Sequence, residues 1–500
     1  MRSLPVALVT LLLAQGCATT RFENTPLEAG HANVERRAVD VSHADRPLIL
    51  VAFSGGGSRA AALGWVILRD LEKYRYASSD GTTRSLVDDI AIVSSVSGGS
   101  VIAAQFALHG AAGLDRFESE FLALDNTRTL GIEALDPLNW VTSAFTGTSR
   151  SDLVEQLLDR ELFGHRTFAD LNQPGKPYLI LNATDMASGD VFSFTPKRFD
   201  DICADLDAQS IASGVAASAA VPVAFTPIAL RNYSTERCVG APVPSWISNR
   251  LKGAYAPYLN VDAFRLARYA NDLRHGPDSF RRIDYVYLLD GGLADNLAVH
   301  GLLEALSSPY AAPIVAPPDT QVGTAGTVLQ AINSGRVRKV GVIVVNARAD
   351  PASKISQAAS RPGILGMIGA VTSLPIDSAS GSVNAQIDSL LSQFNAAGGG
   401  APPDSAGNPQ FTGLKVYGIE IDFDQLRPSD PAQRTLRDQA KEIPTLWTIT
   451  KPNLDVIERA GTTLLNQHPC FQRLLSDLGI QAEFVEVTFA RMGCRQAADR

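Results

Sequence analysis

The chain alternates between short, uninterrupted apolar runs and longer segments in which apolar residues recur at helical spacing. The apolar run at 47–53 precedes a helix-like segment at 58–76, and the run at 90–93 precedes another at 101–108. Two successive strand–turn–helix units predict parallel strands joined by right-handed crossovers. The pattern therefore predicts an α/β fold with a mostly parallel central sheet.

Further apolar runs and periodic segments extend this prediction along the chain. Strands are expected at 178–183, 285–289, 340–346 and 414–421, and helices at 151–162, 293–306, 433–440 and 452–467. The stretches at 311–326 and 395–409 are rich in Gly, Pro and Ala, and strand-like runs continue after both. We therefore expect these two stretches to be surface loops within one domain.

The N-terminus has the pattern of an export signal. One arginine precedes an apolar stretch at 4–14, which is too short to span a bilayer, since spanning needs about 20 apolar residues. Residues 1–16 are thus expected to be a signal peptide, and Ala14-Gln15-Gly16-Cys17 resembles the cleavage box of bacterial lipoproteins. We expect a lipid on Cys17, a polar tether at 17–45, and a membrane-anchored envelope protein at the outer membrane or periplasmic face. An ordinary signal peptide with an incidental cysteine is the alternative.

Composition and cysteine content narrow the class of protein. With 45% hydrophobic residues and a net charge of −8, the chain is globular and lacks the basic surplus of a nucleic-acid binder. The remaining cysteines are Cys203, Cys238, Cys470 and Cys494. Proximity favours the disulfides Cys203–Cys238 and Cys470–Cys494, although other pairings and free thiols are also compatible with the sequence. No Cys/His spacing predicts a metal site.

Three short segments, each after a predicted strand, carry the candidate chemistry. The glycines at 55–57 can expose backbone N–H groups to an anion. Ser97, in Ser95-Val96-Ser97-Gly98-Gly99, lies at a sharp strand-to-helix turn that suits a nucleophile. Asp290 ends a strand before two glycines, and we expect it at the carboxyl edge of the sheet. Taken singly, each segment also fits an ordinary turn, and the spacing of nucleotide-binding loops is absent.

In this order the three segments resemble the patatin-like phospholipase family, whose pattern is Gly-Gly-Gly-x-Arg/Lys, Gly-x-Ser-x-Gly and Asp-Gly-Gly/Ala. The segments at 181–185 (LNATD), 217–222 (ASAAVP) and 444–445 add to the similarity, which covers roughly residues 47–467. The resemblance implies a three-layer α/β fold with helices on both faces of the sheet. It also implies Ser97 as nucleophile, Asp290 as its partner, and oxyanion donors from Gly55, Gly56, Gly57 and Gly98, without metal or cofactor. Ser95 and Ala60 replace glycines of the family pattern but remove no reacting group.

The resemblance also implies a domain organisation and leaves the role of Arg59 open. A patatin-like hydrolase domain is expected at 46–470, with insertions at about 241–282, 311–335 and 355–410 and a C-terminal extension at 471–500. Arg59 follows the glycines and either fixes their loop or contacts an anionic head group. A solvated charge in the first helical turn is the third interpretation.

Only two histidines, His300 and His468, follow Asp290, and neither belongs to a recognisable loop motif. We therefore expect a Ser–Asp dyad in a serine lipid acyl hydrolase that acts on phospholipid or another acyl-ester lipid. Two alternatives remain open. The protein could be an envelope lipoprotein that uses its patatin-like domain only for binding, or a His-assisted esterase for small soluble esters.

Overall fold

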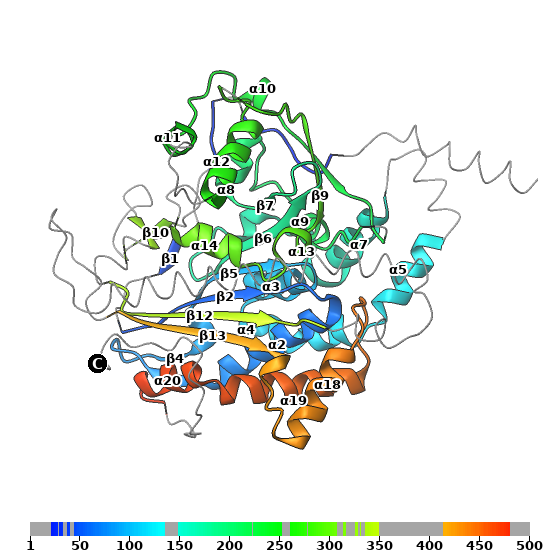
Figure 1. The fold of residues 1–500 in the computed structure, drawn as a ribbon, viewed down its shortest axis with the longest axis vertical. Coiled ribbons are helices and arrows are strands. Elements are labelled where there is room, and N and C mark those ends of the chain that lie inside the picture. Colours follow the sequence, from blue (N-terminus) through cyan, green and yellow to red (C-terminus); the bar gives the residue numbers. More distant parts are fainter. Residues whose placement is uncertain are drawn as a thin grey trace, which may run out of the picture.

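A mixed β-sheet forms the centre of the fold, with helices on both of its faces (Figure 1). The computed structural model describes residues 22–28, 30–33, 38–40, 45–135, 149–222, 224–252, 261–277, 279–307, 314–316, 326–328, 331, 336–349 and 414–480. The expected signal peptide at 1–16, Cys17, Cys494 and the expected insertion at 355–410 lie outside the described residues.

The eight strands of the sheet form a parallel half and an antiparallel half that share β6. In spatial order, the parallel half consists of β13 (Lys415–Asp422), β12 (Lys339–Asn346), β2 (Leu48–Phe53), β5 (Ile90–Val96) and β6 (Tyr178–Asp185). The antiparallel half continues from β6 with β9 (Tyr285–Asp290) and β8 (Ile228–Arg231), while β7 (Val191–Ser193) also pairs with β6. The predicted α/β class and the predicted strands are confirmed.

The two faces of the sheet are packed against different helices. Residues of β2 alternate, so that Ile49 and Val51 join one buried cluster while Leu48 and Leu50 join another. The first cluster includes α2 (Gly57–Lys73), α3 (Gly98–His109) and α19 (Lys451–Gln467), and the second includes α14 (Val299–Ser307). The fold therefore has three layers, as the family resemblance implied.

The other described helices surround this framework. They are α4 (Ala111–Phe117), α5 (Asn126–Leu135), α7 (Arg150–Leu158), α8 (Pro196–Asp201), α9 (Ile211–Ser218), α10 (Ser234–Arg237), α11 (Ser245–Lys252), α12 (Val261–Leu273), α13 (Gly292–Asp295), α18 (Pro431–Glu442) and α20 (Pro469–Asp477). The single helix expected at 293–306 is divided into α13 and α14, because Ala298 between them adopts a φ of +57°. Short strands β1 (Ala38–Asp40), β10 (Ile314–Ala316) and β11 (Gly326–Thr327) form a separate small sheet.

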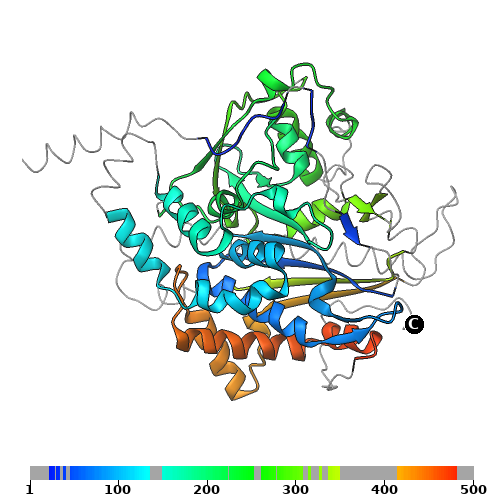
Figure 2. The ribbon, with the colours of Figure 1, turned by 180° about the vertical axis from the view of Figure 1, so that it is seen from behind.

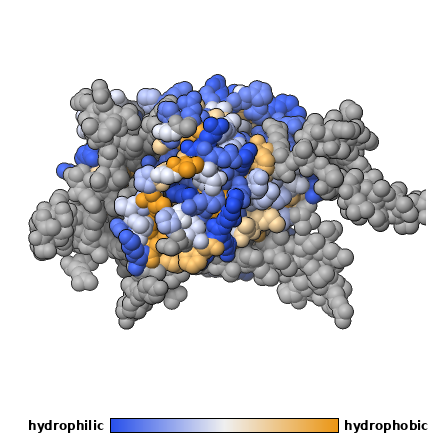
Figure 3. Space-filling view, turned by 90° about the horizontal axis from the view of Figure 1, so that it is seen from above, coloured by the Kyte–Doolittle hydropathy of each residue, from blue (hydrophilic) through white to orange (hydrophobic). Residues whose placement is uncertain are grey.

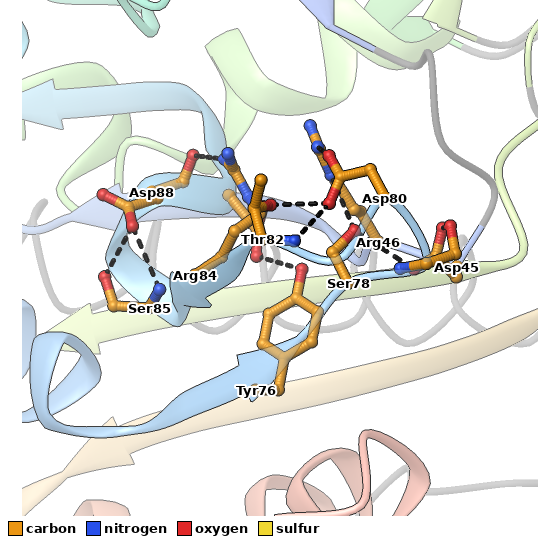
Figure 4. A network of polar contacts seen from close by, with 11 residues as sticks. Asp45, Arg46, Tyr76, Ser78, Asp80, Thr82, Arg84, Ser85 and Asp88 are labelled. Carbon is orange, nitrogen blue, oxygen red and sulfur yellow. Dashed lines mark hydrogen bonds and ion pairs between the residues drawn. The ribbon is translucent and has the colours of Figure 1, made fainter.

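A polar network fixes the hairpin of β3 (Arg75–Ala77) and β4 (Thr83–Ser85) near the start of β2 (Figure 4). The Tyr76 hydroxyl donates to Asp89 at 2.7 Å, and Arg84 donates to the other carboxylate oxygen of Asp89 at 3.0 Å. Arg46 forms an ion pair with Asp80 in the turn of the hairpin. Burial and the hydrogen bond to Asp89 raise the pKa of Tyr76, so its hydroxyl stays protonated and acts as a donor. The network is structural and lies apart from the three motif segments.

Residues 22–28, which belong to the tether expected at 17–45, are packed against the antiparallel half. The Asn24 side chain donates to the Arg231 carbonyl and accepts from the Arg231 N–H, both at 2.8 Å, so it extends the edge at β8. The Leu27 N–H donates to the Cys203 carbonyl at 2.9 Å, and both Asn24 and Leu27 are buried. Figures 1 and 2 both show this dark-blue segment running along the antiparallel half. Hydrogen bonds from polar side chains to backbone groups leave no periodic pattern in the sequence. The hydrophobic pattern therefore could not predict that this segment packs here.

The expected insertion at 241–282 and the start of the expected C-terminal extension both contribute buried side chains to the fold. The insertion expected at 241–282 contains α11 and α12, and its Ile247 and Leu273 side chains are fully buried. At the other end, α20 crosses the boundary expected between 470 and 471, and Phe471 and Leu474 belong to the main buried cluster. Within the described residues, no helix is long and apolar enough to span a bilayer.

Candidate active site

Ser97 occupies a strained turn between β5 and α3. Its φ of +52° is unusual for a residue with a side chain, and such a conformation costs roughly 1–3 kcal/mol. The surrounding structure holds it in place: the Ser97 N–H donates to the Ser218 hydroxyl at 2.9 Å, and the Ser97 carbonyl accepts from Ser100 N–H at 2.9 Å. The side chain of Ser97 is therefore fixed at the end of the strand and at the N-terminus of a helix.

The glycines after Ser97 allow the turn to approach the first motif segment. A Cβ atom on Gly98 would lie 2.0 Å from the Gly57 carbonyl oxygen, and one on Gly99 would lie 2.5 Å from the Ser54 carbonyl oxygen. Neither position accepts a side chain without movement of the backbone. The structure thus brings the first two motif segments into direct backbone contact.

Asp290 reaches Ser97 from the antiparallel half of the sheet. We expected Asp290 at the carboxyl edge of the sheet, in a fold whose strands are mostly parallel. Its strand β9 is instead antiparallel to β6. The register places Asp290 opposite Ala183, one residue beyond Asn182, which is opposite Val96 on the other side of β6. Asp290 therefore lies beside the serine turn even though its strand arrives from the opposite direction.

The two side chains are in hydrogen-bond contact. The Ser97 Oγ donates to Asp290 Oδ2 at 2.7 Å, and the other carboxylate oxygen accepts from the Gly292 N–H at 2.8 Å. Ser97 is 8% and Asp290 5% exposed. Burial raises the pKa of Asp290 to about 6, although its hydrogen bonds from Ser97 and Gly292 oppose the rise. A carboxylate with such a pKa is suited to accept a proton near neutral pH.

Ser218, at the end of α9, connects the two halves of the site. Its hydroxyl accepts from the Ser97 N–H and donates to the Asn182 carbonyl at 2.6 Å, while its own carbonyl accepts from the Gly291 N–H at 3.0 Å. In the sequence, Ser218 lies in the segment 217–222, which resembles the family, but no pattern there assigns it a role. That resemblance is the one sequence signal that points to Ser218.

The segment 55–57, which we call the glycine loop, presents backbone donors beside Ser97. The Gly55 N–H donates to the Asn296 carbonyl at 3.0 Å, so it is already engaged. Within the described residues, the N–H groups of Gly56, Gly57 and Gly98 donate to no acceptor. Gly56 and Gly57 have positive φ values of 140° and 59°, which explains the need for glycine there. Three of the four predicted oxyanion donors are thus open.

The Arg59 side chain binds backbone and side-chain groups next to the glycine loop. Its guanidinium donates to the carbonyls of Ala347, at 2.8 Å, and Ile443, and to the Thr445 hydroxyl at 3.2 Å. The residue is only 2% exposed, and burial lowers its pKa to about 10, so it remains charged at neutral pH. Of the interpretations open from the sequence, these contacts support the loop-fixing one, and the low exposure contradicts a solvated charge. The head-group contact stays a prediction.

Apolar side chains lie next to the glycine loop. The Ser58 N–H donates to the Leu446 carbonyl at 2.7 Å, and the Leu446 side chain is exposed. The neighbouring Trp447 is half-buried and contacts the ring of Phe225, with centroids 6.1 Å apart. The site therefore has an apolar border on the side of the glycine loop.

The remaining predicted site residues lie elsewhere. Cys203 and Cys238 form a disulfide at the base of α10 with a Cα–Cα distance of 6.2 Å, and Cys470 is buried at the start of α20. Among the described histidines, none hydrogen-bonds to Ser97 or Asp290. His300 is held in α14, where its N–H donates to Asp295, and His468 caps α20 with a pKa that burial lowers to about 4.

Comparison with known proteins relates these motifs to a family. The model of the patatin-like phospholipase family matches residues 51–303, which include all three motif segments. Human GIVD cytosolic phospholipase A2 in complex with methyl gamma-linolenyl fluorophosphonate is similar over 89% of this chain and 63% of that chain, at 11% identity and a TM-score of 0.37. The chain therefore spans less than two thirds of that human protein. VipD from Legionella pneumophila is similar over 95% of this chain and 78% of that chain, at 12% identity and a TM-score of 0.25. Among curated proteins, none matches the sequence.

Proposed function

Since the chain belongs to the patatin-like phospholipase family, we propose that it is a serine lipid acyl hydrolase that cleaves phospholipid or a related acyl-ester lipid. Family membership supports lipid acyl hydrolysis in general. The observation that carries the specific mechanism is the 2.7 Å hydrogen bond between Ser97 and Asp290 beneath open backbone N–H groups.

The reaction begins when Ser97 Oγ attacks the ester carbonyl carbon and Asp290 accepts the hydroxyl proton. Asp290 then gives this proton to the leaving alcohol, and an acyl-serine remains. Water attacks the acyl group while Asp290 takes a proton from it, and the proton returns to Ser97 as the fatty acid leaves. The raised pKa of Asp290 supports this proton transfer, because a base with a pKa of about 6 can both accept and release a proton at neutral pH.

The negative charge that develops on the carbonyl oxygen requires donors that are already in place. The N–H groups of Gly56, Gly57 and Gly98 are suited to this role, and the N-terminus of α3 adds a favourable dipole. Arg59 acts indirectly, since it holds the glycine loop against the segment around Ile443. The chemistry needs no metal or cofactor.

Activity-based labelling tests the mechanism and separates it from a binding-only role. A fluorophosphonate probe should label the parent protein but not Ser97→Ala, and peptide mapping should locate the label on Ser97. Ser100→Ala is a matched control, since its hydroxyl is also buried and contacts Ser218, yet it should still be labelled. An unlabelled parent protein would favour the binding-only alternative.

Two further measurements address the esterase alternative. A lipid hydrolase should turn over faster when its ester substrate passes from monomers to micelles, whereas an esterase for soluble esters should show no such increase. His300→Ala should retain hydrolysis, because no described hydrogen bond joins His300 to the dyad, and the bond from its backbone N–H to Asp295 persists in the variant. Loss of activity in His300→Ala comparable to that of Ser97→Ala would support the His-assisted mechanism instead.

We also propose that the protein is an exported lipoprotein of the cell envelope, anchored through a lipid on Cys17. The support is the sequence pattern at 1–17. Metabolic labelling with a radioactive fatty acid should label the parent protein but not Cys17→Ser. A parent protein that carries no label would contradict the lipid anchor.

A further inference from the structure

Exposed apolar side chains are concentrated near the carboxyl edge of the parallel strands. Six large apolar side chains are exposed in the described residues, and Met186, Tyr285, Tyr287 and Leu446 belong to this edge. Met186 follows the last residue of β6, and its N–H donates to the Tyr287 carbonyl at 2.8 Å. Because β9 is antiparallel, its first residues extend beyond the carboxyl end of β6. Soluble proteins rarely expose such a group without a partner.

The N-terminal segment contributes a fourth member to a continuous patch. The Phe22 ring stacks on Tyr285 with centroids 5.2 Å apart, and Tyr285 and Tyr287 share one face of β9. We call Phe22, Met186, Tyr285 and Tyr287 the edge patch. Met186 is 61%, Tyr285 47% and Tyr287 38% exposed. Tyr287 is three residues from Asp290, about 10 Å along the strand, so the patch lies close to the reacting groups.

The docking of residues 22–28 leaves little chain between the edge patch and the proposed lipid. Hydrogen bonds of Asn24 hold this segment against β8, and the Leu27 N–H binds the carbonyl of the disulfide-bonded Cys203. The carboxylate oxygens of Glu23, Asp152 and Glu155 lie within 4.8 Å of one another, so the segment also lies against α7. Only residues 18–21 separate Cys17 from Phe22, and five residue steps span at most about 18 Å. A lipid on Cys17 would therefore hold Phe22 within that distance of the bilayer.

The charge around the patch suits an anionic lipid surface. The segment 231–284 has nine lysine and arginine residues against five acidic ones, although the whole chain has a net charge of −8. Arg231 is paired with Tyr285 across the strands, and Arg281 donates to the Ala187 carbonyl beside Met186. Arg231 also forms an ion pair with Glu236. Hydrophilic side chains predominate on the upper surface of this half and surround smaller groups of hydrophobic ones (Figure 3). Amphipathic aromatic residues with a basic rim are typical of membrane interfaces.

We propose that the edge patch is the surface with which the protein rests on the bilayer that holds its lipid anchor. This inference depends on the proposed lipid on Cys17 and on the proposed lipid substrate. A single acyl chain gives only marginal membrane binding, so a second contact is needed for stable attachment. The edge patch supplies that contact, and it turns the edge of the sheet that carries Ser97 towards the substrate.

The test uses the full chain with Cys17→Ser, so that binding through the patch is measured without the anchor. Vesicles of phosphatidylethanolamine and phosphatidylglycerol at a 3:1 ratio serve as the probe in a flotation assay. The double variant Met186→Glu/Tyr287→Glu should bind these vesicles about tenfold more weakly, because two apolar contacts are replaced by charges. It should lose vesicle-phospholipid hydrolysis by a similar factor and retain hydrolysis of a soluble short-chain ester.

Ala432→Glu/Thr435→Glu is the matched control, since it adds the same two charges at exposed positions of α18, across the sheet from β9 (Figure 1). It should change none of the three readouts. Tyr285→Ser is a second test that adds no charge, and it replaces the double variant if the latter does not fold. It should also weaken vesicle binding. Vesicle binding of the folded variants equal to that of the parent overturns the proposal. If the parent hydrolyses neither ester, the proposed function fails, while the binding data still decide the role of the patch.

Discussion

Replacement of Asp290 by asparagine should abolish hydrolysis and yet stabilise the protein at neutral and alkaline pH. Asp290 is buried, and its pKa rises from 3.8 to about 6. Each pKa unit corresponds to 1.36 kcal/mol, so the ionised carboxylate costs the folded state about 3 kcal/mol. Asparagine has nearly the same shape as the neutral acid and does not ionise.

The sign of the pH dependence follows from the direction of the shift. The pKa is higher in the folded state, so the folded protein favours protonated Asp290. This contribution to stability is fully present below about pH 4, is lost as the pH rises through 6, and is absent above pH 7. Between pH 4 and pH 8, the unfolding free energy of the parent should therefore fall by about 3 kcal/mol relative to that of Asp290→Asn.

Urea unfolding of both proteins at unit pH intervals from 4 to 8 measures this difference. The loss of one hydrogen bond in the variant is nearly independent of pH and cancels in the comparison. Ser97→Ala is the control: it should also be inactive, but it removes a hydrogen bond that lowers the pKa of Asp290. Its stability should therefore fall with pH even more than that of the parent.

The activity of the parent should have an acid limb near pH 6, because only ionised Asp290 accepts the Ser97 proton. The value of kcat/KM should rise about tenfold between pH 5 and pH 7. A constant stability difference across the pH range, together with an acid limb near pH 4, would refute the reasoning from burial.

Three other substitutions test how the site is held together. Ser218→Ala should lower kcat by at least about tenfold with a smaller effect on KM, because the N–H of Ser97 loses its acceptor and the strained turn relaxes; steady-state kinetics on a soluble ester measures both. Gly98→Ala should destroy activity and lower the melting temperature, since its Cβ would lie 2.0 Å from a carbonyl of the glycine loop, whereas Gly341→Ala, with no atom closer than 3.7 Å, should be tolerated. Arg59→Met should destabilise the fold by roughly 2–4 kcal/mol in urea unfolding, because buried carbonyls lose their charged donor. Unchanged stability in Arg59→Met would contradict its role in fixing the loop.

The hydrophobic pattern predicts most of the framework because each buried strand is an uninterrupted apolar run. Strands such as β2, β5 and β12 begin and end within a few residues of their predicted limits. The direction of β9 could not be predicted in this way, because an apolar run reads alike in parallel and antiparallel strands. The division at Ala298 was also missed, because a left-handed residue leaves no mark on the hydrophobic pattern.

The motif segments identified the side chains that the structure brings into contact, but not those that support them. Ser97 and Asp290 are recognisable because a nucleophile and a carboxylate each follow a strand and precede glycines. The Ser218 hydroxyl contacts Ser97, Ser100 and Asn182, which are distant from it in the sequence, and no local pattern records such contacts. The involvement of Gly55 with Asn296 is equally invisible, since adjacent glycines look equivalent in a sequence.

The support of the glycine loop by residues far downstream bears on how a lipid-cleaving enzyme is made safely. Arg59 and Ser58 bind carbonyls of Ile443 and Leu446, which the ribosome adds almost four hundred residues later. A partly synthesised chain already contains Ser97 and Asp290, but it lacks the carbonyls that Arg59 and Ser58 bind. Under the proposed function, this order of synthesis would delay lipid hydrolysis until the chain is nearly complete.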